Sequence, residues 1–170
     1  MVGSALKRIN KEIKDFFDDP PERTQLFGFI KDILYGVLQG PPNSLYENGF
    51  FQFTIKFSND YPWKPPRFLF QTKIFHPYIN EEFGSVYLDI LKDQWCPAIT
   101  IQKIIFYIHS LLYEPNPDDD DGMNDSAVKL YKTNRMEYEK TVREYTSKYA
   151  NFSTVQNELK KLNFAMKLSN

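Results

Sequence analysis

The fold is decided by the stretch Gly84-Ser85-Val86-Tyr87-Leu88-Asp89-Ile90-Leu91, which runs on to Trp95-Cys96-Pro97-Ala98. It is preceded by Lys73-Ile74-Phe75-His76-Pro77-Tyr78-Ile79-Asn80. Nothing in residues 72–100 has the sustained period of a helix or a strand. A loop of this length in a compact chain is usually functional or disordered, and its apolar content argues against disorder. We therefore expect the functional site within residues 72–100.

The composition indicates one globular domain, since 170 residues can bury a substantial core. The formal net charge is −1, so we expect neither nucleic acid nor an anionic membrane as partner. One cysteine excludes an internal disulfide, and with two histidines it argues against a zinc cluster, so no metal or organic cofactor is expected. No apolar run approaches the roughly 20 residues of a membrane span, and the N-terminus lacks an apolar signal region. We expect a cytoplasmic or nuclear protein, or one found in both places.

Helical periods occur towards both ends of the chain. Residues 5–17 predict a first helix, with Ser4 as its N-cap. The strongest helical pattern begins at Ile101, with Thr100 as the expected N-cap. Two more helices are expected before residue 150. An apolar stripe then continues at spacings of three and four through Phe152, Val155, Leu159, Leu162 and Met166.

The strands are expected between the first helix and the long loop. Residues 26–38 are mixed apolar and predict the first strand. Residues 51–57 alternate apolar and polar side chains, which is typical of a strand with one buried face. Residues 60–66 contain three prolines and cannot form a central strand, while residues 67–71 predict the next one. The order of helix, strands, long loop and helices predicts an α+β domain with helices segregated from an antiparallel sheet.

Over roughly residues 5–150 the chain resembles the ubiquitin-conjugating enzymes. Besides the two stretches above, the marks of the resemblance are Ala5-Leu6-Lys7-Arg8-Ile9, Asp19-Pro20-Pro21, Gly40-Pro41, Tyr46-Glu47-Asn48-Gly49-Phe50-Phe51, Asp60-Tyr61-Pro62-Trp63-Lys64-Pro65-Pro66, Pro115-Asn116-Pro117-Asp118 and Lys148-Tyr149-Ala150. The resemblance implies a UBC-like fold with an N-terminal helix, a four-stranded antiparallel meander, a long active-site loop and C-terminal helices. Residues 5–150 would form this core domain, and residues 151–170 a C-terminal amphipathic helical extension.

Two aromatic residues depart from the family pattern. The family carries ubiquitin as a thioester on a cysteine within G-x-(I/V)-C-L-D-I-L, and that position is Tyr87 here. A free thiol titrates near about 8.5 and leaves readily, whereas a phenol titrates near about 10. The asparagine of the family's His-Pro-Asn, which helps to stabilise the oxyanion, is replaced by Tyr78, and removing such a donor typically costs ~10²-fold or more in rate. The pair favours natural loss of activity, with the Tyr87 ring capping the vacated pocket.

Three other residues match positions near the family's site. Asp119 falls where the family keeps an acidic gate that orients the incoming lysine amine, although residues 118–121 could equally be a solvated acidic turn. Cys96 is the alternative thiol, in an element where the family usually has serine, and a small inert side chain is the other interpretation. His76 is expected to hold the loop by hydrogen bonds.

The family's ligase-facing surface is matched by Lys7, Arg8, Trp63, Pro97 and Ala98. In the family a large apolar residue at the position of Trp63 is the exposed docking anchor, and tryptophan often dominates interface energies. Alternatively, Trp63 packs among its neighbouring prolines.

The sequence leaves three functions open. The first is a catalytically inactive, regulatory binding module whose partners are ubiquitin or a ubiquitin-like modifier, a ligase or an active conjugating enzyme. The second is an active conjugating transferase that uses Cys96. The third is a structural subunit docked through the C-terminal stripe, which could pack on this domain, on a second copy or in a partner's groove.

Overall fold

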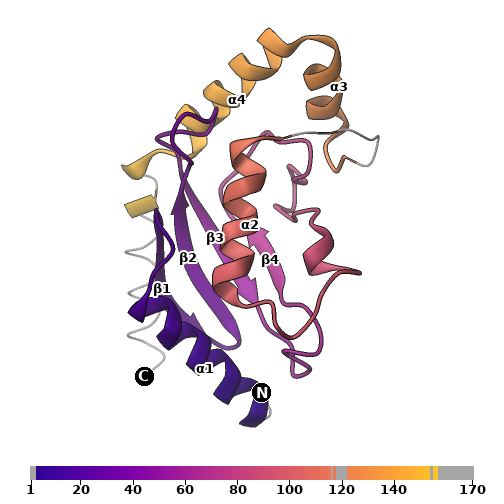
Figure 1. The fold of residues 1–170 in the computed structure, drawn as a ribbon. Helices are drawn as coiled ribbons and strands as arrows, with labels where there is room; N and C mark the ends of the chain where they lie inside the picture. The colour runs from indigo at the N-terminus through magenta and orange to yellow at the C-terminus, as the bar shows by residue number, and fades with distance from the viewer. Residues whose placement is uncertain (1–2, 116, 118–121, 154, 157–170) are drawn as a thin grey trace.

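The computed structural model describes residues 3–115, 117, 122–153 and 155–156 (Figure 1). Its elements follow the order α1 (Gly3–Asp18), β1 (Thr24–Ile30), β2 (Ile33–Gln39), β3 (Phe50–Lys56), β4 (Arg67–Phe70), a 3₁₀ turn η1 (Asp89–Leu91), α2 (Ile101–Tyr113), α3 (Asp125–Thr133) and α4 (Arg135–Tyr149). Helix α2 crosses one face of the sheet, α1 lies at one end of the domain, and α3 and α4 lie at the other.

The sheet is an antiparallel meander in the strand order β1-β2-β3-β4. On one face of β3, the side chains of Phe51, Phe53 and Ile55 are buried. They belong to the same hydrophobic core as Ile104 and Ile108 on the apolar face of α2. The alternate residues of β3 point to the other face of the sheet. The predicted α+β fold with a four-stranded antiparallel meander is confirmed.

The prediction of one strand within residues 26–38 was wrong, because this segment contains two strands. Ile30 pairs with Ile33, so only Lys31 and Asp32 lie in the turn, and both have positive φ angles of 46° and 70°. Turns of this kind favour Asn-Gly or Asp-Gly, and neither pair occurs here. The strand boundary therefore has no clear signal in the sequence.

The expected helix caps had different outcomes. Ser4 is not an N-cap, because α1 already includes Gly3 and Ser4 lies in its first turn. Thr100 is the N-cap of α2, since its hydroxyl oxygen accepts a hydrogen bond from the Lys103 amide. The long loop over residues 72–100 is confirmed, with η1 as its only named element in the described chain.

The C-terminal stripe lies only partly within the described residues. Phe152 and Val155 are helical, whereas Leu159, Leu162 and Met166 lie outside the part of the chain that is described. No helix among the described residues is long and apolar enough to cross a membrane.

Candidate functional site

The two aromatic residues singled out in the sequence lie side by side in the structure. The Tyr87 amide donates to the Tyr78 carbonyl oxygen at 2.8 Å, and Ile79 pairs with Val86 in an isolated antiparallel bridge. The two halves of the loop, residues 78–80 and 85–87, are therefore joined by main-chain hydrogen bonds.

The Tyr87 ring makes contacts with two neighbouring side chains. It stacks on the Tyr78 ring, with centroids 6.3 Å apart and an interplanar angle of 29°. The Lys92 Nζ lies 3.3 Å from the Tyr87 ring centroid, which is a close cation–π contact. The stack and the ammonium group together fix a half-buried phenol at this position of the loop.

The turn between the two halves is anchored to the sheet and to α4. Gly84 has a φ angle of +67°, and a Cβ atom there would lie 1.9 Å from the Phe70 carbonyl oxygen, so only glycine fits. The Phe70 amide donates to the Gly84 carbonyl oxygen at 2.8 Å. On the other side, the Tyr145 hydroxyl donates to Glu81 Oε1 at 2.7 Å, and this bond raises the pKa of Tyr145 to about 12.

His76 connects this loop to the end of α2. Its Nδ1 accepts a hydrogen bond from the Tyr78 amide at 2.9 Å, so the ring proton is on Nε2, which donates to the Leu111 carbonyl oxygen at 3.0 Å. The side chain is 0% exposed, and burial lowers its pKa to about 4. His76 is thus a neutral brace that fixes the main chain of Tyr78.

Protonation of His76 at low pH should weaken its contribution to the stability of the fold. Because the pKa of His76 in the fold lies below the usual 6.5, the unfolded chain binds the proton first as the pH falls. His76 therefore stabilises the fold above pH 6.5, and this contribution of about 3 kcal/mol is lost as the pH falls towards 4. Titration of both imidazoles by NMR should give a pKa of about 4 for His76. A value at or above 6.5 would contradict the buried, neutral tautomer.

Cys96 lies on a different part of the loop. Its neighbours face α1 and the proline-rich loop: the Pro97 carbonyl oxygen accepts from Arg8 Nη2, and Trp95 Nε1 donates to the Pro62 carbonyl oxygen, both at 2.9 Å. The Cys96 side chain is exposed. Within the described residues, no group of three or more His, Cys, Asp or Glu side chains is placed to hold a metal ion.

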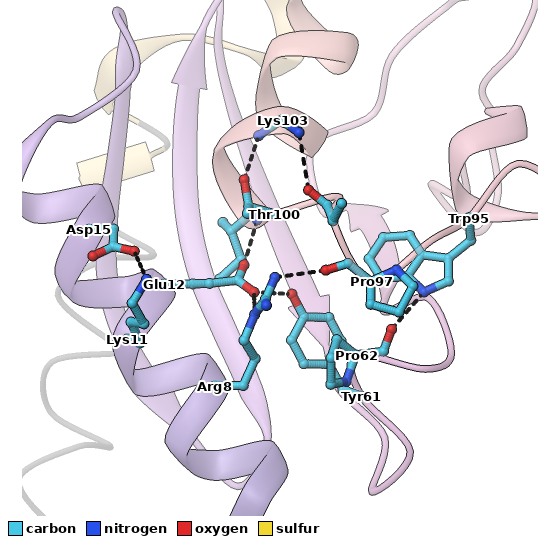
Figure 2. A network of polar contacts seen from close by, with 12 residues as sticks. Arg8, Lys11, Glu12, Asp15, Tyr61, Pro62, Trp95, Pro97, Thr100 and Lys103 are labelled. Atoms are coloured by element: carbon cyan, nitrogen blue, oxygen red, sulfur yellow. Dashed lines mark hydrogen bonds and ion pairs between the residues drawn. The ribbon is translucent and has the colours of Figure 1, made fainter.

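A buried carboxylate organises the polar contacts that join Arg8, Tyr61 and Pro97 (Figure 2). Glu12 is 4% exposed and accepts hydrogen bonds from three directions. Arg8 Nε and the Tyr61 hydroxyl donate to its Oε1, the latter at 2.7 Å, and the Ile101 amide donates to its Oε2 at 2.8 Å. The carboxylate thus ties α1 to the proline-rich loop and to the N-terminus of α2. Burial and the bond to Glu12 raise the pKa of the Tyr61 phenol well above its usual value.

The outer edge of this network carries Trp63, whose side chain is 78% exposed. The Trp63 amide donates to the Asp60 carbonyl oxygen at 2.7 Å, which closes a turn beneath the indole. The alternative that Trp63 packs among its neighbouring prolines was wrong. Lys7 and Ala98 are also exposed, and Arg8 and Pro97 are partly so. We call these five residues, Lys7, Arg8, Trp63, Pro97 and Ala98, the docking surface after the role expected from the resemblance, which stays a prediction.

The model of one protein family, described as ubiquitin-conjugating enzyme, matches residues 8–146. This chain belongs to the ubiquitin-conjugating enzyme family. The match spans α1 to α4, and with it the loop that holds Tyr87. The chain therefore has the ubiquitin-conjugating (UBC) fold and is a UBC-like protein in ubiquitin-like conjugation.

The structure brings the predicted residues of this UBC domain together in two places. Tyr78 and Tyr87 form one, and the docking surface with Cys96 beside it forms the other. Asp119 lies outside the described residues, so its prediction as an acidic gate stays a prediction. Sequence reasoning missed Glu12, although a charged residue three positions after Ile9, on the apolar stripe of α1, was a usable signal.

Proposed function

We propose that this protein is a catalytically inactive member of the ubiquitin-conjugating enzyme family that acts by binding. The observation that carries the proposal is the Tyr87 ring, which contacts both the Tyr78 ring and the Lys92 ammonium group. On the family's motif, Tyr87 stands where the thioester cysteine belongs. A phenol held in this stack has neither the nucleophilicity nor the leaving-group quality that thioester transfer requires.

The surroundings of Tyr87 support the same proposal. The family's asparagine would present a side-chain amide to the oxyanion, and Tyr78 has no such group. Its aromatic ring instead completes the stack with Tyr87. The two aromatic replacements, Tyr78 and Tyr87, therefore pack on each other. This is expected if aromatic side chains came to occupy the former catalytic site after catalysis was lost.

Cys96 supports a second candidate function, an active transferase with a displaced thiol. It is the single cysteine of the chain and its side chain is exposed. However, Trp95 and Pro97 on either side of it are hydrogen-bonded to Pro62 and Arg8, within the docking surface and its supports. A thioester there would occupy the surface that we assign to partners, so we favour binding.

The binding role centres on the docking surface, with a ligase as the partner class. An indole that is 78% exposed above a hydrogen-bonded turn is a rigid aromatic anchor, the kind of residue that dominates interfaces. Glu12 joins α1, the proline-rich loop and the N-terminus of α2 by hydrogen bonds. The conformation of the docking surface should therefore change little on binding. The same rigidity would serve an active conjugating enzyme as partner.

Trp63→Ala is expected to weaken binding to a ligase domain by about 30-fold, the equivalent of a hot spot of roughly 2 kcal/mol. Titration calorimetry against a panel of ligase domains measures this change. The matched control is Tyr113→Ala, which removes a ring that is 57% exposed at the far end of α2. If both variants bind a ligase as the parent protein does, the ligase role of the docking surface is wrong.

A further inference from the structure

The two halves of the loop that meet at Tyr78 and Tyr87 are held by different parts of the fold. Residues 85–87 are held by the sheet, because Ser85 pairs with Leu69 of β4 in an isolated antiparallel bridge. Residues 78–80 are held by contacts to α2, α3 and α4. The stack of the two tyrosine rings therefore lies where a segment fixed to the sheet meets a segment fixed to the helices.

At its start, the segment that contains Tyr78 is fixed to α2 and α3. The His76 side chain donates a hydrogen bond to a carbonyl oxygen in the last turn of α2. The Pro77 carbonyl oxygen accepts hydrogen bonds from the amides of Met123 and Asn124, at 2.8 and 3.2 Å. Asn124 is the N-cap of α3, so the residue before Tyr78 is fastened to the N-terminus of that helix.

Glu81 fixes the other end of this segment to α3 and α4. Its Oε1 accepts the hydrogen bond from the Tyr145 hydroxyl of α4 at 2.7 Å, and its Oε2 accepts a longer one from Asn124 Nδ2 at 3.5 Å. The Asn124 side chain is buried, and its Oδ1 accepts from the Ala127 amide at 3.1 Å. One carboxylate thus contacts a residue of α4 and the capping residue of α3.

The turn around Glu81 is otherwise closed on itself. The Asn80 Oδ1 accepts hydrogen bonds from the amides of Glu82 and Phe83, at 3.1 and 2.8 Å. The Asn80 carbonyl oxygen accepts from the Gly84 amide at 2.9 Å. These bonds fix the shape of the turn but not its place beside the helices. The Glu81 carboxylate supplies the hydrogen bonds that place it there.

Helices α3 and α4 form one packed unit. Asn134 alone separates them, as the C-cap of α3 and the N-cap of α4. The Tyr131 ring of α3 packs on the Tyr138 ring of α4, with centroids 5.2 Å apart and an interplanar angle of 77°. A change in the position of either helix should therefore reach the loop at both Pro77 and Glu81.

We propose that Glu81 is a positioning residue, through which the α3–α4 unit sets how the Tyr78 ring packs on the Tyr87 ring. Without the Glu81 carboxylate, the segment stays fixed at residues 76 and 77 but loses its attachment next to Asn80. The Tyr78 ring then no longer has a fixed position relative to the sheet-held half. Glu81 acts in this way whether or not Tyr87 has replaced a catalytic cysteine.

The test is an NMR comparison of full-chain variants. Glu81→Ala should shift the amide signals of Tyr78 and Tyr87 and weaken the nuclear Overhauser effects between their rings. The signal of Ile105 inside α2 should stay in place. The matched control is Glu82→Ala, which removes a neighbouring exposed carboxylate and should leave both tyrosines unchanged.

Two further variants separate the hydrogen bond from the charge. Tyr145→Phe keeps the Glu81 charge but removes the donor, so it should reproduce the effect of Glu81→Ala on the two rings. The double variant should add nothing further, because both changes break the same contact. Glu81→Gln keeps an oxygen that can accept from Tyr145 and should restore the ring contacts.

Two results would overturn the proposal. The first is a set of ring contacts between Tyr78 and Tyr87 that stays unchanged in Glu81→Ala, which would mean that the stack is held without the helices. The second is a change in Glu81→Ala that Tyr145→Phe does not reproduce, which would reflect the lost charge alone. If Glu81→Ala prevents folding, Tyr145→Phe decides the outcome, since it removes only one hydroxyl.

Discussion

Tyr87→Cys combined with Tyr78→Asn is expected to form a thioester with ubiquitin and to pass it to lysine, whereas the parent protein does neither. The first change restores a thiol where the family motif has one, and it also removes the ring that contacts Tyr78 and Lys92. The second restores a side-chain amide that can donate to the oxyanion. An oxyanion donor is typically worth ~10²-fold in rate.

The matched comparison is Tyr87→Cys alone. This single variant should become charged but discharge to lysine about 10²-fold more slowly than the double variant. Charging is measured on a non-reducing gel and discharge by the loss of the adduct after lysine is added. Equal discharge rates would contradict the interpretation that Tyr78 occupies the position of a required oxyanion donor, and Tyr87→Phe should remain uncharged throughout.

The largest expected effect on stability belongs to Glu12→Ala. The change leaves the Arg8 guanidinium, the Tyr61 hydroxyl and the Ile101 amide without their shared acceptor. Breaking a buried ion pair by removing one partner typically costs about 3 kcal/mol or more. Urea unfolding should therefore show a loss of about this size in the free energy of unfolding.

Asp15→Ala is the control on the same helix. The Lys11–Asp15 pair has the same spacing of four residues, with an Nζ–Oδ2 distance of 3.2 Å, but both side chains are well exposed. Such a pair contributes only about 0–1 kcal/mol. If Glu12→Ala costs no more than Asp15→Ala, Glu12 does not organise the docking surface.

The general fold could be predicted from the sequence because its decisive elements have clear periods. The apolar face that begins at Ile101 predicts α2, and the alternation over residues 51–57 predicts β3. The division between β1 and β2 could not be predicted in this way, since Lys31 and Asp32 adopt positive φ angles without glycine or asparagine. A turn of that kind is recognised only when the strand pairing is known.

The sequence was sufficient to predict which residues belong to the candidate site, but not which of their side chains are in contact. The motif places Tyr78 and Tyr87 in one loop, yet no spacing rule says that their rings stack or that Lys92 lies over Tyr87. The bond from Tyr145 to Glu81 joins α4 to the turn across 64 positions, which no local pattern reveals. Glu12 differs, because its place on the apolar stripe of α1 was visible in advance.

The most direct test of the inactive state is a charging assay with activating enzyme, ATP and ubiquitin, repeated with several ubiquitin-like modifiers. Tyr87→Cys serves as the positive comparison. A phenol in place of the thiol at Tyr87, in contact with Tyr78 and Lys92, predicts that the parent protein shows no adduct on a non-reducing gel. A reductant-sensitive adduct on the parent protein that Cys96→Ala abolishes would contradict the account and make the chain an active transferase.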